Sequence, residues 1–311
     1  MDILSGPAAL RRWTIASVVA NMVLVVTGAL VRLTKSGLGC PTWPQCDSRS
    51  YLPHPELGVH GAIEFGNRLL TFVLAAIAIG TLVAAYRARR VDKTLRRLAV
   101  IAALGIPVQA VIGGLSVLSQ LNPWVVALHL VASVALIMLC VAMAHRASAA
   151  APSVVSVRTL ALARVVFAVG LLVCALGAVV TGAGPNSGDG AAQRNGMSLE
   201  WTAKTHAVAV WVLVALTVWL VIRLRGSRPA YRAAHILLGI ELLQGLVGYV
   251  QYFTHLPLGI VITHMLGTAL FSAALMHLLL SVRGTAIGAG SVPAQPMNSA
   301  STAAATKTSA R

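Results

Sequence analysis

Four histidines within or beside long apolar segments are the residues best suited to carry chemistry. They are His60, His129, His206 and His264. Each lies at or near the same end of its apolar segment, so we expect all four in one depth band of a membrane, near its outer face. Imidazole is a common axial ligand of heme iron, and helical bundles often hold heme between facing helices. The pattern predicts one porphyrin site between His60 and His129 and a second between His206 and His264.

Each of these histidines has an alternative role as a hydrogen-bonding residue between membrane helices. An ionisable residue inside a span is nevertheless a functional candidate, and the repetition of the pattern favours ligation over four separate hydrogen bonds. The other five histidines are interpreted as solvated, interfacial or structural. These are His54, His145, His235, His255 and His277.

Glu64 is a candidate for moving protons. It follows His60 by four residues and precedes Asn67 by three, and these spacings place the three side chains on one helical face. A carboxylate in a span is costly unless it has a partner or a function. Glu64 could donate or accept a proton near a bound substrate, or it could form an ion pair with Arg68. Arg32 and Arg68 are candidates for binding heme propionates by bidentate pairing.

Cys40 and Cys46 lie in the longest outer loop, residues 33–62. Because this loop faces the oxidising side, the two cysteines are expected to form a disulfide. An exposed bridge in a short loop is redox-labile more often than a buried one, and a purely structural staple is the alternative. Cys140 and Cys174 lie within spans and are interpreted as small apolar residues.

Small and polar residues near the histidines leave further alternatives open. Glycines at 113–114, 245 and 248 would let backbone approach a flat macrocycle, or would serve ordinary helix packing. Gln109 and Gln244 would hydrogen-bond a ligand or bridge two helices. Glu241 has no counterpart in the first half of the chain, and its role is left unassigned.

The composition defines the elements that must position these residues. Of the 311 residues, 57% are hydrophobic and 10% are charged, whereas soluble domains average about 25% charged residues. A bilayer span needs about 20 apolar residues. We therefore predict an all-α integral membrane protein with eight transmembrane helices, at residues 13–33, 64–86, 97–118, 123–144, 162–182, 202–222, 233–253 and 257–282.

An internal repeat divides these spans into two sets of four. The pentapeptide Val-Val-Thr-Gly-Ala occurs at 25–29 and again at 179–183. In both halves a glutamine, Gln109 or Gln244, precedes a histidine by twenty residues. Four spans return the chain to its starting side, so both halves have the same orientation. The repeat predicts two four-helix bundles related by a pseudo-twofold axis along the membrane normal.

The net charge of +16 is explained by topology rather than by nucleic acid binding. With a cytoplasmic N-terminus, 18 Lys and Arg residues fall on the inner side and 6 on the outer side, as the positive-inside rule requires. The basic cluster at 87–97 is then a topology signal, with anionic lipid binding as a second role. No cleavable signal peptide is expected, and both termini are predicted to be cytoplasmic.

These boundaries predict five regions. They are a cytoplasmic N-terminus at 1–12, an N-terminal four-helix bundle at 13–144, a cytoplasmic linker at 145–161, a C-terminal four-helix bundle at 162–282 and a disordered cytoplasmic tail at 283–311. The tail is rich in Ala, Ser, Thr and Pro, a composition that cannot bury a core.

Several motifs together resemble the heme A synthases, over roughly residues 13 to 282. The resemblance is carried by Gly28-Ala29-Leu30-Val31-Arg32, Ser36-Gly37-Leu38-Gly39-Cys40, Trp43-Pro44-Gln45-Cys46, Ile63-Glu64-Phe65, Asn67-Arg68 and the two segments that run from glutamine to histidine. It implies a heme B cofactor between His206 and His264 in the C-terminal bundle, and the substrate heme O near His129 in the N-terminal bundle.

The resemblance also assigns the residues of the first half. Glu64 corresponds to the functionally important glutamate of the family, and Cys40 and Cys46 match its outer-loop cysteine pair. Asn67 and Arg68 are implied to bind the substrate heme. Many relatives carry a histidine where this chain has Asn67. Either His60, two helical turns earlier, replaces that ligand, or the first site has only one strong axial histidine.

The reaction implied by the resemblance is oxidation of the C8 methyl group of heme O to a formyl group by successive hydroxylations, yielding heme A for terminal oxidases. The implied partners are a heme O synthase, an unidentified electron donor and the lipid bilayer, in a bacterial plasma membrane. Homo-oligomerisation is left open. Two alternatives are a non-enzymatic diheme electron carrier and a heme transporter. The inner halves of the spans have few ionisable groups, which disfavours the transporter.

Overall fold

The computed structural model of this chain describes residues 4, 6–48, 50–88, 92–148, 150–190 and 192–284. In this part of the chain eight helices are long and apolar enough to cross a membrane, so the predicted all-α membrane fold with eight spans is confirmed. The helices are α1 Pro7–Leu33, α2 Gly58–Arg87, α3 Lys93–Leu118, α4 Pro123–Ala147, α5 Val157–Ala183, α6 Leu199–Arg223, α7 Arg228–Phe253 and α8 Leu258–Leu280.

Large apolar side chains cover the outside of the helices. Phe72, Trp201 and Phe253 are each at least 70% exposed. Exposed apolar patches of this extent are rare on soluble monomers, whereas lipid accepts them without penalty. Helices also pair most of their backbone polar groups within one segment, which is what a bilayer requires of a spanning structure.

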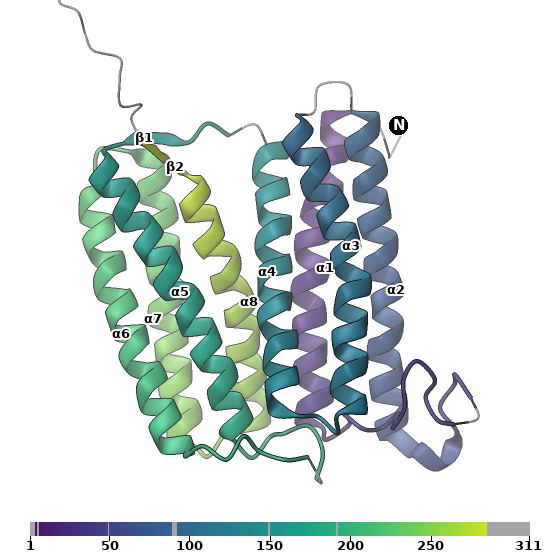
Figure 1. Cartoon of the computed structure of the whole chain (residues 1–311). Helices are drawn as coiled ribbons and strands as arrows, with labels where there is room; N and C mark the ends of the chain where they lie inside the picture. Colours follow the sequence, from purple (N-terminus) through teal and green to yellow (C-terminus); the bar gives the residue numbers. More distant parts are fainter. Residues whose placement is uncertain are drawn as a thin grey trace, which may run out of the picture.

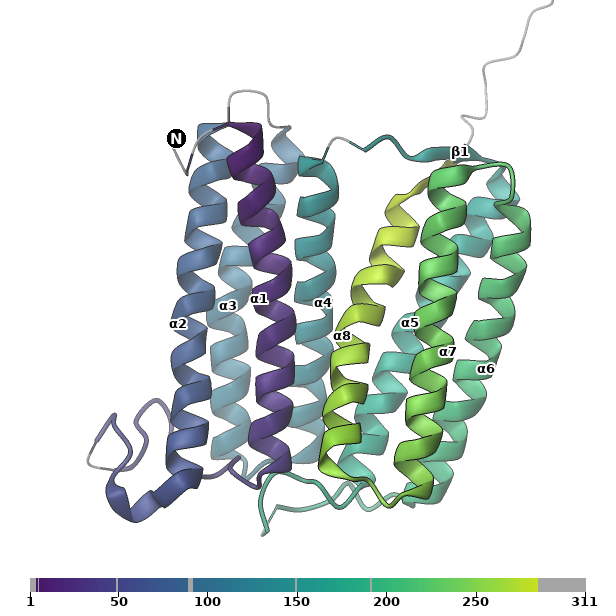
Figure 2. The ribbon, with the colours of Figure 1, turned by 180° about the vertical axis from the view of Figure 1, so that it is seen from behind.

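Helices α1–α4 lie together as one group and α5–α8 as another (Figures 1 and 2). Each group has its own main cluster of buried apolar side chains, and the cluster of the second group also includes Val134 and Met138 of α4. A smaller cluster joins the two groups and includes Val25 of α1, Ile137 of α4 and Ala269 of α8. We call the groups the first and second bundles. Their division into a substrate-heme half and a heme B half stays a prediction.

The turns that join α3 to α4 and α7 to α8 have the same backbone geometry. Gln120 and Leu121 have φ of 53° and 57°, and His255 and Leu256 both have φ of 63°. In each turn the leucine N–H donates to the carbonyl five residues earlier, at 2.7 and 2.9 Å. Two consecutive non-glycine residues in the left-handed region are uncommon. Their recurrence supports the duplication, and the pseudo-twofold axis itself stays a prediction.

Several helices begin earlier than the apolar runs suggest. Helix α2 starts at Gly58, after a short 3₁₀ turn, η1 Pro55–Leu57. His60, which the sequence analysis placed ahead of this helix, therefore lies in its first turn. Helix α3 starts after Asp92, whose side chain accepts a hydrogen bond from the Leu95 N–H at 2.6 Å. Capping residues are polar, so a hydropathy profile places such helix starts too late.

A two-stranded parallel sheet was not predicted. Strand β1, Ser153–Val155, pairs with β2, Val282–Gly284, and so ties the α4–α5 connection to the end of α8. Strand β2 includes the first two residues of the predicted tail. The sheet lies at the same end of the molecule as the start of α1 (Figure 1). The start of α1 and the end of the described chain at Gly284 thus lie at one end of the molecule, and the cytoplasmic location of both termini stays a prediction.

Some sequence predictions fall outside the described residues. They concern the tail from residue 285 onward, residues 1–3 and 5 of the N-terminus, and the charges assigned to Arg49, Arg89 and Arg90.

Candidate functional site

Three of the four candidate histidines lie at matching depths. We call the end of the bundles that carries the α1–α2 connection the loop end. His129 of α4, His206 of α6 and His264 of α8 each lie about two helical turns in from this end. In each ring Nδ1 is buried and has no hydrogen-bond partner among the described residues. Buried polar atoms are normally paired, so these rings are suited to a bound group.

A glycine on the preceding helix lies against each of these imidazoles. A Cβ atom added to Gly113, Gly177 or Gly248 would lie 3.3, 3.3 and 3.4 Å from Cε1 of the histidine. The nearest neighbour of Gly113 and Gly248 is thus the imidazole itself, which explains why glycine stands there. Gly177 was not singled out in the sequence, because a lone glycine in an apolar segment looks like any packing residue.

The second bundle contains a cavity of about 730 Å³. Residues from all four of its helices line it, together with Leu130 of α4. His206 and His264 both face this cavity, and Gly177, Gln244 and Glu241 also line it. Most of the lining is apolar. Cofactor sites are typically cavities of about 300–1,000 Å³ with apolar walls and few polar groups. The cavity therefore fits a macrocycle held between two histidines.

The two glutamines bridge helices, which is one of the two roles expected from the sequence, and a contact with a ligand stays a prediction. Gln244 Nε2 donates to the carbonyl of His264 at 2.9 Å. Gln109 Nε2 donates to Ser133 Oγ at 2.6 Å and lies 3.5 Å from the carbonyl of His129. Both glutamines thus hold the helix that carries a candidate ligand.

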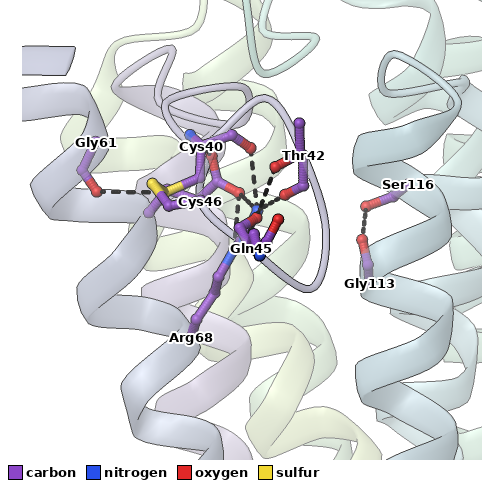
Figure 3. A network of polar contacts seen from close by, with 9 residues as sticks. Cys40, Thr42, Gln45, Cys46, Gly61, Arg68, Gly113 and Ser116 are labelled. Carbon is purple, nitrogen blue, oxygen red and sulfur yellow. Dashed lines mark hydrogen bonds and ion pairs between the residues drawn. A yellow bond between two sulfur atoms is a disulfide. The ribbon is translucent and has the colours of Figure 1, made fainter. Parts of the chain in front are cut away.

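Arg68 fixes the α1–α2 loop to α2 (Figure 3). Its Nη2 lies 2.6 Å from Glu64 Oε1 and donates to the carbonyls of Cys40 and Thr42, both at 3.0 Å. Its Nη1 donates to the carbonyl of Gln45 at 3.2 Å. The guanidinium group thus binds the loop and Glu64, and the predicted contact of Arg68 with a heme propionate stays a prediction.

Glu64 completes this network. It is 6% exposed, and its Oε2 accepts a hydrogen bond from the Cys40 N–H at 2.7 Å. With Oε1 bound to Arg68, both oxygens of the carboxylate are engaged. Of the two roles considered for Glu64, the structure shows the ion pair directly. Its role in moving protons stays a prediction.

Cys40 and Cys46 form the predicted disulfide. Both cysteines are 0% exposed, so the bridge lies inside the loop rather than on its surface. The expectation of a redox-labile bridge rested on exposure, and this burial favours the structural staple. Cys140 is buried and Cys174 is half-buried, and both are free thiols as expected.

The same loop packs on α3 through Trp43. A Cβ atom added to Gly114 would lie 2.3 Å from Cδ2 of the Trp43 indole, so the ring lies directly on the helix backbone. Gly114 adjoins Gly113, which lies against the His129 ring. The loop therefore covers the first bundle next to its candidate histidine. The sequence identified both Trp43 and Gly114 but gave no indication of their contact.

His60 does not join the buried histidines. Its side chain is exposed, and its Nδ1 lies 2.9 Å from Ser36 Oγ in the loop. Its predicted role as a heme ligand is untested. Asn67, on the same helix, has a buried Oδ1 with no partner among the described residues. A polar atom in this state is available to a bound group.

Two contacts join the bundles at the loop end. Arg32 Nη2 donates to the carbonyl of Thr181 on α5 at 2.5 Å, and the N–H of Gly37 donates to the carbonyl of Gly188 at 2.9 Å. Arg32 Nε is buried and has no partner within the described ranges. The predicted propionate contact of Arg32 therefore retains one free donor.

Comparison with known proteins identifies the family. Residues 11–59 and 56–186 match the family described as cytochrome oxidase assembly protein (COX15-CtaA), which covers more than half of the chain. The chain belongs to this family. The matched residues include the disulfide loop, Glu64, Arg68 and His129, whereas His206 and His264 lie beyond them.

Relatives of this family member share part of its sequence. A heme A synthase from Listeria welshimeri is 30% identical over 121 residues, which are 39% of this chain and 39% of the relative. One from Bacillus pumilus is 30% identical over 123 residues, again 39% of each chain. One from Geobacillus kaustophilus is 32% identical over 109 residues, 35% of this chain and 33% of the relative. The aligned part thus spans about two fifths of these relatives or less. The membership makes the chain a multi-pass membrane protein of a heme-associated family.

The donor set of this family member suits heme better than a free metal ion. Among the described residues, no group of three or more His, Cys, Asp or Glu side chains could hold a metal ion. His206 and His264 line one cavity and could together hold the iron of a heme. The residues present therefore fit a heme in the second bundle.

Proposed function

We propose that this chain is a heme A synthase, which oxidises the C8 methyl group of heme O to a formyl group by successive hydroxylations. The family membership carries this proposal, because the matched segments contain the loop, Glu64 and His129. The names of the relatives support the same activity.

In this proposal His206 and His264 hold heme B in the second bundle. Their rings face the same cavity, and each has an unpartnered Nδ1. Gln244 fixes the backbone at His264 and Gly248 makes room for its ring. When bound there, heme B would supply electron transfer and oxygen chemistry that side chains lack. The protein would contribute two ligands, a largely apolar cavity and a fixed orientation.

The first bundle is proposed to bind heme O near His129. The loop lies over this bundle, with Trp43 on α3 and the Glu64–Arg68 pair on α2. A cover of this kind would exclude water from the reacting edge of the substrate. Asn67 offers a polar atom without a partner. We assign His129 as the histidine ligand here and leave His60 out, because its ring is exposed and bound to the loop.

Glu64 is proposed to exchange protons at the first site. A buried carboxylate can hold or release a proton close to a reacting group. In the described structure its oxygens accept from Arg68 and Cys40, so it would act only when the loop shifts away from α2. Substrate entry below the loop would require the same shift.

The wider setting follows from the proposed reaction. A heme O synthase would deliver the substrate. An electron donor would supply the electrons that are consumed when oxygen is reduced. We propose a bacterial plasma membrane as the location, with both termini in the cytoplasm and the disulfide loop on the oxidising side.

Heme extraction and chromatography test the proposal. Membranes that contain this chain and a heme O synthase are compared for wild type, Glu64→Ala and the exposed control Glu200→Ala. We expect heme A with wild type and with the control, and heme O with bound heme B for Glu64→Ala. If folded wild-type protein with a working electron supply yields only heme B and unchanged heme O, the enzyme proposal fails. A diheme electron carrier would then be the better explanation.

A further inference from the structure

Glu241 is a buried carboxylate that the proposed reaction does not use. It is 3% exposed and lies near the middle of α7, far from both membrane faces. Its Oε1 accepts a hydrogen bond from Thr217 Oγ1 of α6 at 2.9 Å. Its Oε2 is buried and has no partner among the described residues. A carboxylate in this position is costly when charged, which marks it as a functional candidate.

Glu241 lines the same cavity as His206 and His264. Thr217 follows His206 by eleven residues, so the carboxylate lies about 16 Å along the α6 axis from that ring. The cavity extends from residues at the loop end, including Leu199 and Leu256, to Glu241. A charge on the bound iron and a charge on Glu241 would thus share one apolar space, where they are screened much less than in water.

Among the described residues that line the cavity, no cation neutralises Glu241. The titratable residues that line the cavity come from α5, α6, α7 and α8 and are Cys174, Lys204, His206, Glu241, Tyr249, Tyr252 and His264. Lys204 is the only permanent cation of this set, and it forms an ion pair with Glu200 at the loop end. It lies thirteen residues before Thr217, about 20 Å along α6. The charge of Glu241 therefore depends on a proton or on the charge of a bound group.

We infer that Glu241 is a redox-linked proton site, which takes up one proton when the iron held between His206 and His264 gains one electron. The inference rests on the proposed heme site in the second bundle. Glu241 forms one O–H bond, at the unpartnered Oε2, while a one-electron donor reduces the bound iron from ferric to ferrous. The proton comes from water, so the total charge inside the cavity does not change.

This coupling has a physical advantage for the protein. Adding an electron to a buried group in an apolar bundle leaves an uncompensated charge, which is costly in a low-dielectric interior. A proton taken up nearby cancels that charge. Thr217 would tune the site, because its hydroxyl stabilises the ionised carboxylate and so keeps Glu241 able to release the proton again on oxidation.

A redox titration at several pH values tests the inference on purified, heme-loaded protein. The midpoint potential of the bound heme is followed by its absorbance in wild type, Glu241→Gln and Glu56→Gln, which changes an exposed carboxylate of η1. We expect the wild-type potential to fall as pH rises, by at most about 59 mV for each tenfold drop in proton concentration. Glu241→Gln should lose this fall and keep the high potential found for wild type at low pH. The exposed control Glu56→Gln should behave as wild type.

Two further measurements test the inference if Glu241→Gln folds poorly. Thr217→Val removes the hydroxyl that stabilises the ionised carboxylate and leaves Glu241 in place. The pH range over which the midpoint potential falls should therefore move to higher pH. Redox-difference infrared spectra of wild type should show a carboxylic acid C=O band that appears on reduction and that Glu241→Asp shifts. If the potential of Glu241→Gln depends on pH as in wild type, or if no such band appears, the inference is overturned. If wild type binds no heme through His206 and His264, the proposed heme site has failed instead.

Discussion

Glu64 and Arg68 lie one helical turn apart on α2, and together they hold the backbone of the disulfide loop. Their side chains meet at 2.6 Å, Glu64 accepts from the Cys40 N–H, and Arg68 donates to three loop carbonyls. The pair is largely buried, with side-chain exposures of 7% and 20%. An ion pair of this kind contributes mainly through the hydrogen bonds it organises, because desolvation offsets much of its Coulomb attraction.

Arg68→Lys should loosen the loop. A lysine ammonium is a point charge and cannot reach all three carbonyls together with Glu64, as the planar guanidinium does. Each lost charged hydrogen bond corresponds to roughly 1.5–3 kcal/mol, so we expect the disulfide to be reduced at least about tenfold faster. The rate is measured by alkylation of Cys40 and Cys46 under mild reductant, followed by mass spectrometry. The control is Arg194→Lys at an exposed outer position, and equal rates for all three proteins would contradict the prediction.

Trp43 and Gly114 should be energetically coupled. Gly114→Ala places a methyl group where the indole lies, and overpacking of this kind costs about 1–3 kcal/mol. In a Trp43→Ala background the same substitution should be neutral, because the space is then open. Thermal unfolding of the four proteins in detergent gives the coupling. Gly66→Ala is the matched control, since a Cβ there meets nothing within 4 Å. Additive effects of the two substitutions would show that the loop does not rest on α3.

The helices and the depth of the histidines could be predicted from the sequence because both follow from local patterns. Apolar runs define spans, and the position of His129, His206 and His264 in each run defines a common depth. The pairing of β1 with β2 could not be predicted, since strands of three residues that pair across more than a hundred residues carry no local signal. The second span was predicted to start at residue 64 and not at Gly58, because the first turns of α2 contain His60 and two glycines and lie outside the apolar run.

The contacts of the disulfide loop also could not be predicted from the sequence. Nothing in the spacing of Arg68 distinguishes a loop anchor from a partner of a propionate, because both roles need the same guanidinium group. Which of the two roles Arg68 takes depends on where the fold places the carbonyls of Cys40, Thr42 and Gln45. Glu241 could not be assigned for the same reason, since only the packing of α6 and α7 places it on the cavity.

His206→Ala and His264→Ala should each abolish stable heme binding in the second bundle. Loss of one of the two proposed ligands would leave the heme iron with a single protein bond, and we expect retained heme to fall at least about tenfold. His129→Ala should keep this heme and lose only the binding of added heme O. Heme content per protein and the absorption spectrum distinguish the cases. His235→Ala, an exposed histidine on α7, is the control. Full heme retention in His206→Ala would contradict the assignment.

The double variant Cys40→Ser/Cys46→Ser should weaken the loop without abolishing the proposed reaction. Closing so short a loop contributes about 2 kcal/mol in the chain-entropy account. The Glu64–Arg68 contacts do not involve the sulfur atoms, so much of the loop should remain in place. We expect faster proteolysis between α1 and α2 and a yield of heme A within about threefold of wild type, because a buried bridge is a poor redox relay. The yield per protein is measured by extraction with a matched reductant supply. Complete loss of heme A with an intact, protease-resistant loop would show that the two sulfur atoms relay electrons.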